Sequence, residues 1–290
     1  MKLNKKFSFH NIDQEFKEAN KYYNDYGFVI IEDVFSTHNC NEIKNRAIEL
    51  VLNDNSDKTV GFSLRKNKHH SDANFLSSAY KINYFYEDKM VREDGAFKDI
   101  KINCISKLGH CLHDIDKVFK KYSYHDNLKK LFQILKINNP ILGQSSYIFK
   151  QPYIGGEYLW HQDSTYLLTE PLSCLAFSIA IDDANKENGC LIVKPTSHKE
   201  NVRKRVKLVD SKIIREDLIK LEWDEEDNYA LEVKRGAVII FHGSLAHKSL
   251  ENTSNFSRNS YVIHFFDKKA NYSKENWLQR PHSFPFKDYL

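Results

Sequence analysis

Hydrophobic and polar positions in the first fifty residues change period twice, from helix to strand and back to helix. Apolar side chains recur at helical spacing over residues 12–26 and stop before a glycine, a natural helix C-terminus. The run FVIIEDVF (28–35) is rich in β-branched and aromatic residues, which predicts a strand. A second amphipathic helix is predicted over residues 36–54, with Ser36 or Asn39 as its N-cap.

The next segments continue this mixed pattern. KINYFYED (81–88) alternates as a strand does, whereas ISKLGHCLHDIDKVFKKYS (105–123) and HDNLKKLFQIL (125–135) are predicted to be helices. The first 139 residues are therefore expected to form a helical or mixed support for the rest of the chain.

From about Pro140 the chain becomes a series of short strand-like runs separated by turn-rich segments such as DANKENG. The predicted strands are ILGQSSYIFKQ, YLWHQDS, CLAFSIAIDD, CLIVKP, YALEVK, GAVIIFH and SYVIHFFD. Many short strands with few helices favour a β-sandwich or barrel. We expect a mainly β fold with supporting helices, a jelly roll in one domain over residues 1–290, with its core at about 140–270.

Composition narrows the class of protein. A hydrophobic content of 41% is enough for a substantial core. Five cysteines without a Cys-x-x-Cys pair argue against a disulfide framework and against a thiolate zinc site. No apolar run is long enough to span a membrane, and the basic N-terminus lacks the apolar stretch of a signal peptide. With no clear peroxisomal signal at either end, a cytoplasmic location is expected.

Two basic runs, RKNKHH (65–70) and RKRVK (203–207), stand out in a chain with a formal charge of +4. Such runs are usually solvated faces, although the second could contact a phosphate-bearing ligand. The sequence lacks the combined aromatic and basic pattern of a nucleic-acid surface, so no nucleic-acid partner is expected.

A histidine and an aspartate, His161 and Asp163, lie two residues apart in YLWHQDST. On a strand such residues project to one face roughly 7 Å apart, so their side chains could converge on one ion. Two histidines and one carboxylate suit divalent iron and leave coordination positions open. The third ligand must come from a later strand, which offers His242 and His247. The alternative is a chance pair, hydrogen-bonded at a strand edge.

Arg258 follows His247 by eleven residues and precedes the run SYVIHFF. A β-hairpin of this length is expected to return the chain alongside itself and to place the guanidinium near the metal ligand. The planar guanidinium matches the two oxygens of a carboxylate and keeps its charge when buried. A metal with open positions beside such an arginine suits a keto-diacid cosubstrate.

The spacing His161-x-Asp163 … His247-x(10)-Arg258 resembles that of the phytanoyl-CoA dioxygenase family of iron(II)- and 2-oxoglutarate-dependent oxygenases. The likeness runs from about Phe28 to the C-terminus. It includes the segments KINYFYED, KLGHCLHDIDKVF, YIFKQPYIGGE, HQDSTYLLTEPL, IDDANKENGCLIVKPTSH, RGAVIIFHGSLAHKSLENTSNFSR and ENWLQ. The resemblance implies the double-stranded β-helix fold.

The resemblance also implies roles for individual residues. The implied iron ligands are His161, Asp163 and His247. Arg258 would bind the distal carboxylate of 2-oxoglutarate with Ser249 beside it, and Lys107, on a helix before the barrel, would contact the same cosubstrate. Ser146 and Ser178 would line its pocket. At both positions the family has bulkier residues, methionine and tryptophan, so a wider or wetter wall is expected here.

With Fe(2+), 2-oxoglutarate and O2, the implied activity is oxidative decarboxylation of 2-oxoglutarate to succinate and CO2. Hydroxylation of a lipid-like or acyl-CoA substrate would accompany it. A barrel that binds metal and 2-oxoglutarate without turnover, as a sensor or scaffold, is the alternative on the same fold.

Overall fold

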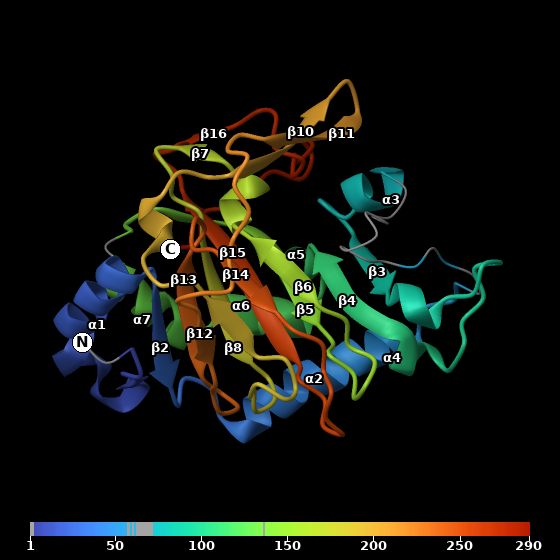
Figure 1. Cartoon of the computed structure of the whole chain (residues 1–290), viewed down its shortest axis with the longest axis horizontal. Helices are drawn as coiled ribbons and strands as arrows, with labels where there is room; N and C mark the ends of the chain where they lie inside the picture. Colours follow the sequence, from blue (N-terminus) through green and yellow to red (C-terminus); the bar gives the residue numbers. More distant parts are fainter. Residues whose placement is uncertain (1–2, 57–58, 60, 62–71, 136) are drawn as a thin grey trace.

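The computed structural model describes residues 3–56, 59, 61, 72–135 and 137–290. The basic run at 65–70 lies outside these residues. Most strands belong to an eight-stranded and a four-stranded sheet, and helices lie along the outer side of the larger one (Figure 1). This arrangement is the β-rich double-stranded β-helix with supporting helices that the sequence predicted.

The larger sheet has strands from both halves of the chain. In spatial order they are β1 (Phe7–Ser8), β2 (Phe28–Glu32), β13 (Val238–His242), β8 (Leu175–Ala180), β15 (Ser260–Asp267), β5 (Pro140–Ile148), β4 (Ile105–His110) and β3 (Ile82–Tyr86). Neighbouring strands are antiparallel except β1 and β2. The part of the chain before residue 140 therefore supplies both edges of this sheet as well as helices.

The smaller sheet and two strand pairs complete the β structure. The smaller sheet consists of β12 (Tyr229–Leu231), β9 (Leu191–Val193), β14 (His247–Ser249) and β6 (Tyr158–His161). The pairs are β10 (Lys204–Val209) with β11 (Lys212–Asp217), and β7 (Thr169–Glu170) with β16 (Asn271–Tyr272). The β10–β11 hairpin projects beyond the ends of the sheet strands, at the top of Figure 1.

The described helices precede β5 except for two short 3-10 turns. They are η1 (Phe9–Asn11), α1 (Ile12–Tyr26), α2 (Thr37–Leu52), α3 (Asp72–Ser77), η2 (Asp88–Met90), α4 (Lys101–Cys104), α5 (Leu112–Ile115), α6 (Lys117–Ser123), α7 (Asp126–Leu135), η3 (Asp163–Thr165) and η4 (Ser197–Lys199). Of the helices in the described part of the chain, none has the length and apolar character needed to cross a membrane.

The first two predicted helices are confirmed, with the expected end signals. Helix α1 ends at Gly27, whose left-handed φ of 83° favours glycine. A Cβ there would also lie 2.5 Å from Nδ1 of His198. Ser36 and Asn39 form a capping box at the start of α2, so both candidate caps take part.

The predicted helix over residues 105–123 is wrong in its first third. Residues 105–110 form β4, which pairs with β3 on one side and with β5 on the other. Helical structure begins only at Leu112, and Asp116 caps α6 through the backbone N–H groups of Val118 and Phe119. Pairing on both edges satisfies the backbone of β4 and outweighs the local helical period.

The hairpin expected between His247 and the strand after Arg258 is also wrong. Strand β14 pairs with β6 and β9 in the smaller sheet, whereas β15 pairs with β5 and β8 in the larger one. The chain thus crosses from one sheet to the other between these strands. Arg258 lies in the segment that connects β14 to β15, where it can contact both sheets.

Candidate active site

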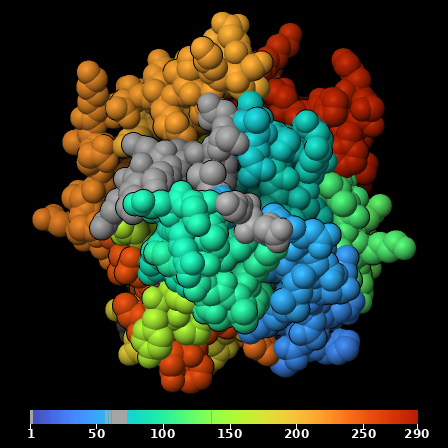
Figure 2. Space-filling view, turned by 90° about the vertical axis from the view of Figure 1, so that its right-hand side faces the viewer, coloured from blue at the N-terminus to red at the C-terminus, as the bar shows by residue number. Residues whose placement is uncertain are grey.

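A cavity of about 410 Å³ lies between the two sheets. Residues of the larger sheet that line it include Lys107, Gln144, Ser146, Ser178, Ser260, Val262 and His264. The opposite wall includes His161, Asp163, His247 and Ser249. Phe75 of α3 and Ile213 and Arg215 of β11 also line the cavity. Figures 1 and 2 place the β10–β11 hairpin (orange) beside the α3 segment (cyan), at this end of the molecule.

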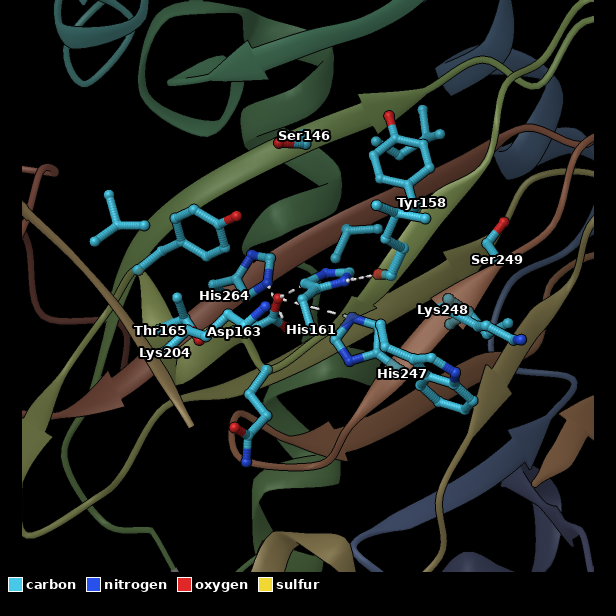
Figure 3. A pocket seen from close by; sticks show the side chains of 18 of the residues that line it. Ser146, Tyr158, His161, Asp163, Thr165, Lys204, His247, Lys248, Ser249 and His264 are labelled. Carbon is cyan, nitrogen blue, oxygen red and sulfur yellow. Dashed lines mark hydrogen bonds and ion pairs between the residues drawn. The ribbon is translucent and has the colours of Figure 1, made fainter. Parts of the chain in front are cut away.

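His161, Asp163 and His247 come together on the wall formed by the smaller sheet. His161 ends β6 and His247 begins β14, and the two residues are direct partners across these antiparallel strands. Gln162 is extended, so Asp163 at the start of η3 points to the same side as His161. Oδ1 of Asp163 lies 3.7 Å from Nε2 of His161 and 3.8 Å from Nε2 of His247. Figure 3 shows both rings directed at this carboxylate.

The two imidazoles are oriented as metal-binding histidines commonly are. Nδ1 of His161 lies 2.8 Å from the carbonyl of Leu159, and Nδ1 of His247 lies 3.0 Å from that of Leu245. If each Nδ1–H donates to its carbonyl, each Nε2 keeps a free lone pair directed at Asp163. One ligand atom from each of the three residues lies within 4.8 Å of the others. The arrangement fits a divalent ion bound by two nitrogens and one oxygen.

The local environment keeps His161 and Asp163 in the protonation states that metal binding requires. Burial, together with the nearby His247, lowers the pKa of His161 to about 4. Burial alone would raise the pKa of the Asp163 carboxyl, but His264, His247 and His161 hold it well below its ordinary value. Near neutral pH the site therefore offers a neutral His161 and an ionised carboxylate, as metal binding requires.

The other candidate ligand from the sequence, His242, is not part of this cluster. Its ring packs 5.6 Å from that of His198, and its Nδ1 accepts a hydrogen bond from the backbone of Ser244. It does not line the cavity, although burial lowers the pKa of His242 to about 4. His242 is therefore a partly buried, hydrogen-bonded histidine that packs outside the candidate metal cluster.

A second group with metal-ligand atoms, formed by Cys111, His113 and Asp114, does not fit a cation. The Asp114 carboxylate already binds Arg280 at 3.2 Å and Lys287 at 2.8 Å. Burial also raises the pKa of the Cys111 thiol to about 12, which keeps it protonated. Metal ligands need a thiolate and an available carboxylate, so this group is an ion-pair cluster.

Arg258 is buried in the cavity wall, with 5% of its surface exposed, and its partners are neutral. Its Nε donates to the carbonyl of Gly189 at 3.0 Å, Nη2 to Oγ of Ser249 at 2.9 Å and Nη1 to Oγ of Ser260 at 3.0 Å. Among the described residues no carboxylate forms an ion pair with it. A buried cation of this kind is suited to a carboxylate ligand.

The remaining predicted residues lie on the inward face of the larger sheet, in rows across its strands. One row runs from Lys107 through Ile148 to Ser260, which contacts Arg258. The next row, two residues further along each strand, contains Ser146, Val262 and Ser178. Both serines line the cavity, as expected. Lys107 does so from strand β4, so the expected helical location is wrong.

Sequence reasoning missed His264, which lies one row beyond Val262. Its Nε2 is 2.9 Å from Oδ2 of Asp163, and its Nδ1 is 3.2 Å from the side-chain nitrogen of Gln144. The alternation of SYVIHFF could have identified it, because Ser260, Val262 and His264 share one face of a strand. Its partner Asp163 lies 101 residues earlier in the chain, so the local sequence does not connect the two.

Solved structures share this fold over most of the chain. The epimerase SnoN from nogalamycin biosynthesis, in complex with Fe3+, alpha ketoglutarate and nogalamycin RO, has a TM-score of 0.62 at 13% identity. The alignment covers 94% of this chain and 99% of SnoN. EctD from S. alaskensis, with 2-oxoglutarate and 5-hydroxyectoine, gives a TM-score of 0.62 at 17% identity, covering 91% and 83% of the two chains. The fold is that of the 2-oxoglutarate-dependent non-haem iron dioxygenases.

Sequence relatives identify the family within this class. The profile of phytanoyl-CoA dioxygenase (PhyH) matches residues 23–260. Phytanoyl-CoA dioxygenase 1 of Oryza sativa subsp. japonica is 38% identical over 264 residues, which cover 91% of this chain and 93% of the rice protein. Phytanoyl-CoA dioxygenase domain-containing protein 1 of Rattus norvegicus is 35% identical, covering 90% and 93% of the two chains. The chain belongs to the phytanoyl-CoA dioxygenase family.

Proposed function

We propose that this protein couples oxidative decarboxylation of 2-oxoglutarate to hydroxylation of a lipid-like or acyl-CoA substrate. In the balanced reaction, 2-oxoglutarate, O2 and a substrate C–H bond yield succinate, CO2 and the corresponding alcohol. The observation that carries the proposal is the convergence of His161, Asp163 and His247 in a cavity that also contains the buried Arg258. Fe(2+) would supply the activation of O2 when bound.

Different residues of the cavity wall would bind the iron and the cosubstrate. His161, Asp163 and His247 would hold iron on the smaller sheet. Arg258 would bind the distal carboxylate of 2-oxoglutarate, with its guanidinium oriented by Ser249. Because Arg258 lies where the chain crosses between the sheets, it would orient the cosubstrate toward the metal ligands. The walls of the partly enclosed cavity would limit the access of water to the reacting groups.

Lys107 gives the cosubstrate pocket an expected pH dependence. Its ammonium lies 4.8 Å from the centre of the Phe85 ring, and burial lowers the pKa of Lys107 from 10.5 to about 8. The side chain is charged below this pKa and loses its charge as pH rises through it. If the charge contacts 2-oxoglutarate, kcat/KM for the cosubstrate should fall above pH 8 by about tenfold per pH unit.

The matched variants for this prediction are Lys107→Arg and Lys107→Met. Lys107→Arg keeps a cation at high pH and should remove the decline, whereas Lys107→Met should have low, pH-independent kcat/KM over the same range. The measurement is the initial rate of 2-oxoglutarate consumption between pH 6 and pH 10. A decline that persists in Lys107→Met would assign it to another group.

The lining of the cavity supports a substrate with an apolar body. Phe75, Tyr166, Val206, Ile213 and Trp277 contribute to it, while Lys204 and Arg215 bring cations from the β10–β11 hairpin. Apolar walls with a few charged groups at one end suit a hydrophobic chain that carries an anionic group. Lys204 already pairs with Glu222 at 3.0 Å, which leaves Arg215 as the stronger candidate for an anion.

A substrate screen tests the proposal. Anaerobic protein is loaded with Fe(2+) and 2-oxoglutarate, mixed with acyl-CoA or free-acid candidates and exposed to O2, and succinate and hydroxylated product are measured. We expect one substrate class to stimulate succinate release and to give product in a 1:1 ratio to it. Tight binding of iron and 2-oxoglutarate without succinate release under any condition would instead support the sensor or scaffold alternative. The cytoplasmic location stays a prediction.

A further inference from the structure

The Asp163 carboxylate has a different partner at each of its two oxygens. Oδ1 faces Nε2 of His161 and of His247 at 3.7 and 3.8 Å, distances too long for hydrogen bonds. Oδ2 lies 2.9 Å from Nε2 of His264, which is within hydrogen-bond distance. Figure 3 shows His264 approaching the carboxylate from the side away from His247. One oxygen is therefore directed at the candidate ligand nitrogens, and the other is held by a residue of the larger sheet.

Hydrogen-bonding logic fixes the roles of the two ring nitrogens of His264. An ionised carboxylate only accepts hydrogen bonds, so Nε2 of His264 must carry the proton that it donates to Oδ2. In a neutral ring Nδ1 is then an acceptor, and the amide N–H of Gln144 lies 3.2 Å from it. The Gln144 amide is thus placed to support the tautomer that the carboxylate requires, as the second hydrogen bond of a metal-site histidine commonly does.

The surrounding fold restricts the movement of the hydrogen-bonded series Gln144–His264–Asp163. Gln144 in β5 and His264 in β15 are direct cross-strand partners in the middle of the larger sheet. The pairing of these strands shifts register immediately after His264, and β-bulges of this kind redirect side chains near active sites. Asp163, His264 and Gln144 are each buried, with at most 9% of their surface exposed.

We propose that His264 is a positioning residue that fixes Asp163 as a one-oxygen iron ligand. This inference rests on the proposed function. By holding Oδ2, His264 leaves Oδ1 as the only carboxylate oxygen directed at His161 and His247, and so prevents the carboxylate from rotating to offer both oxygens. A two-oxygen aspartate would occupy one of the coordination positions that the His₂-carboxylate arrangement keeps open for cosubstrate and O2.

The test compares two substitutions of His264 that differ in hydrogen-bonding capacity. His264→Leu removes the hydrogen-bond donor and replaces the imidazole with an apolar side chain of similar size. His264→Gln places an amide N–H at nearly the reach of the imidazole Nε2, so it can donate to Oδ2 again. Protein is titrated anaerobically with Co(2+) in the presence of 2-oxoglutarate, and the visible absorption of cobalt reports both its affinity and its coordination number.

We expect His264→Leu to weaken cobalt binding by roughly 10- to 100-fold and to change the absorption spectrum. His264→Gln should restore the wild-type spectrum and most of the affinity. Wild-type affinity and spectrum in His264→Leu, or equal losses in both variants, would overturn the inference. Wild-type protein that binds no cobalt would overturn the proposed function and this inference together.

A matched control separates positioning from general stability. His113 is also a buried histidine. Its Nδ1 lies 2.8 Å from Oγ of Ser145, and it does not line the cavity. His113→Leu should lower the thermal unfolding midpoint of the metal-free protein without altering the cobalt spectrum. If His113→Leu changes the spectrum as His264→Leu does, the effect belongs to the stability of the sheet and the inference is wrong.

Discussion

Replacing Asp163 with alanine is expected to abolish iron-dependent turnover of 2-oxoglutarate while leaving the protein folded. The substitution removes the carboxylate that faces both His161 and His247 and leaves the two imidazoles as the remaining ligands. Loss of a buried charged partner costs about 3–5 kcal/mol, which corresponds to roughly 100- to 4000-fold in iron affinity. Iron content after anaerobic reconstitution and the rate of succinate formation are the measurements.

The matched control for this variant is His242→Leu. It removes the histidine that the sequence offered, beside His247, as a candidate for the third metal ligand. Because His242 lies outside the cavity, iron content and succinate formation should stay close to wild type. Thermal unfolding of the metal-free proteins shows whether each variant is folded. Full turnover in Asp163→Ala would remove Asp163 from the ligand set, and loss of iron in His242→Leu would reopen the choice of third ligand.

Replacing Arg258 with alanine should raise KM for 2-oxoglutarate steeply. The distal carboxylate of the cosubstrate would then be buried opposite Ser249 and Ser260 without a cation. Truncating one partner of a buried charge pair costs about 2–5 kcal/mol, or roughly 30- to 4000-fold in affinity. Steady-state kinetics with varied 2-oxoglutarate at saturating iron measures the change.

A cosubstrate analogue isolates the contact that Arg258 makes. The 2-oxo acid 2-oxobutyrate keeps the metal-binding keto acid but lacks the distal carboxylate. The wild-type protein should prefer 2-oxoglutarate strongly, whereas Arg258→Ala should lose most of that preference because only the contact with the distal carboxylate is removed. An unchanged preference would show that another group binds this carboxylate.

The sequence predicted the candidate metal cluster well, because its geometry is largely local. The extended Gln162 between them places His161 and Asp163 on one side of the chain, and only the position of a later strand was needed to bring His247 opposite. Arg258 was expected near these ligands for the wrong reason. Its proximity comes from a crossing between sheets, and the length of the connection alone does not distinguish a crossing from a hairpin.

The errors in the fold have a common physical origin in long-range pairing. Ile105, Leu108 and Leu112 recur at helical spacing, so the local pattern continues through what is in fact β4. Pairing with β3 and β5 makes this segment a strand, and both partners are distant from it in the sequence. His264 was missed for the same reason, since its partner Asp163 lies 101 residues away in the chain.

The β10–β11 hairpin belongs to a single stretch of chain between β9 and β12, whereas the candidate metal ligands and Arg258 come from other segments. Its ion pairs, such as the half-buried Lys207 with the exposed Glu216, lie near solvent, where such pairs add little to stability. Substitutions confined to the β10–β11 hairpin can therefore change which substrates enter the cavity, and relatives can differ in this way. The reaction centre would stay the same while the range of accepted molecules changed.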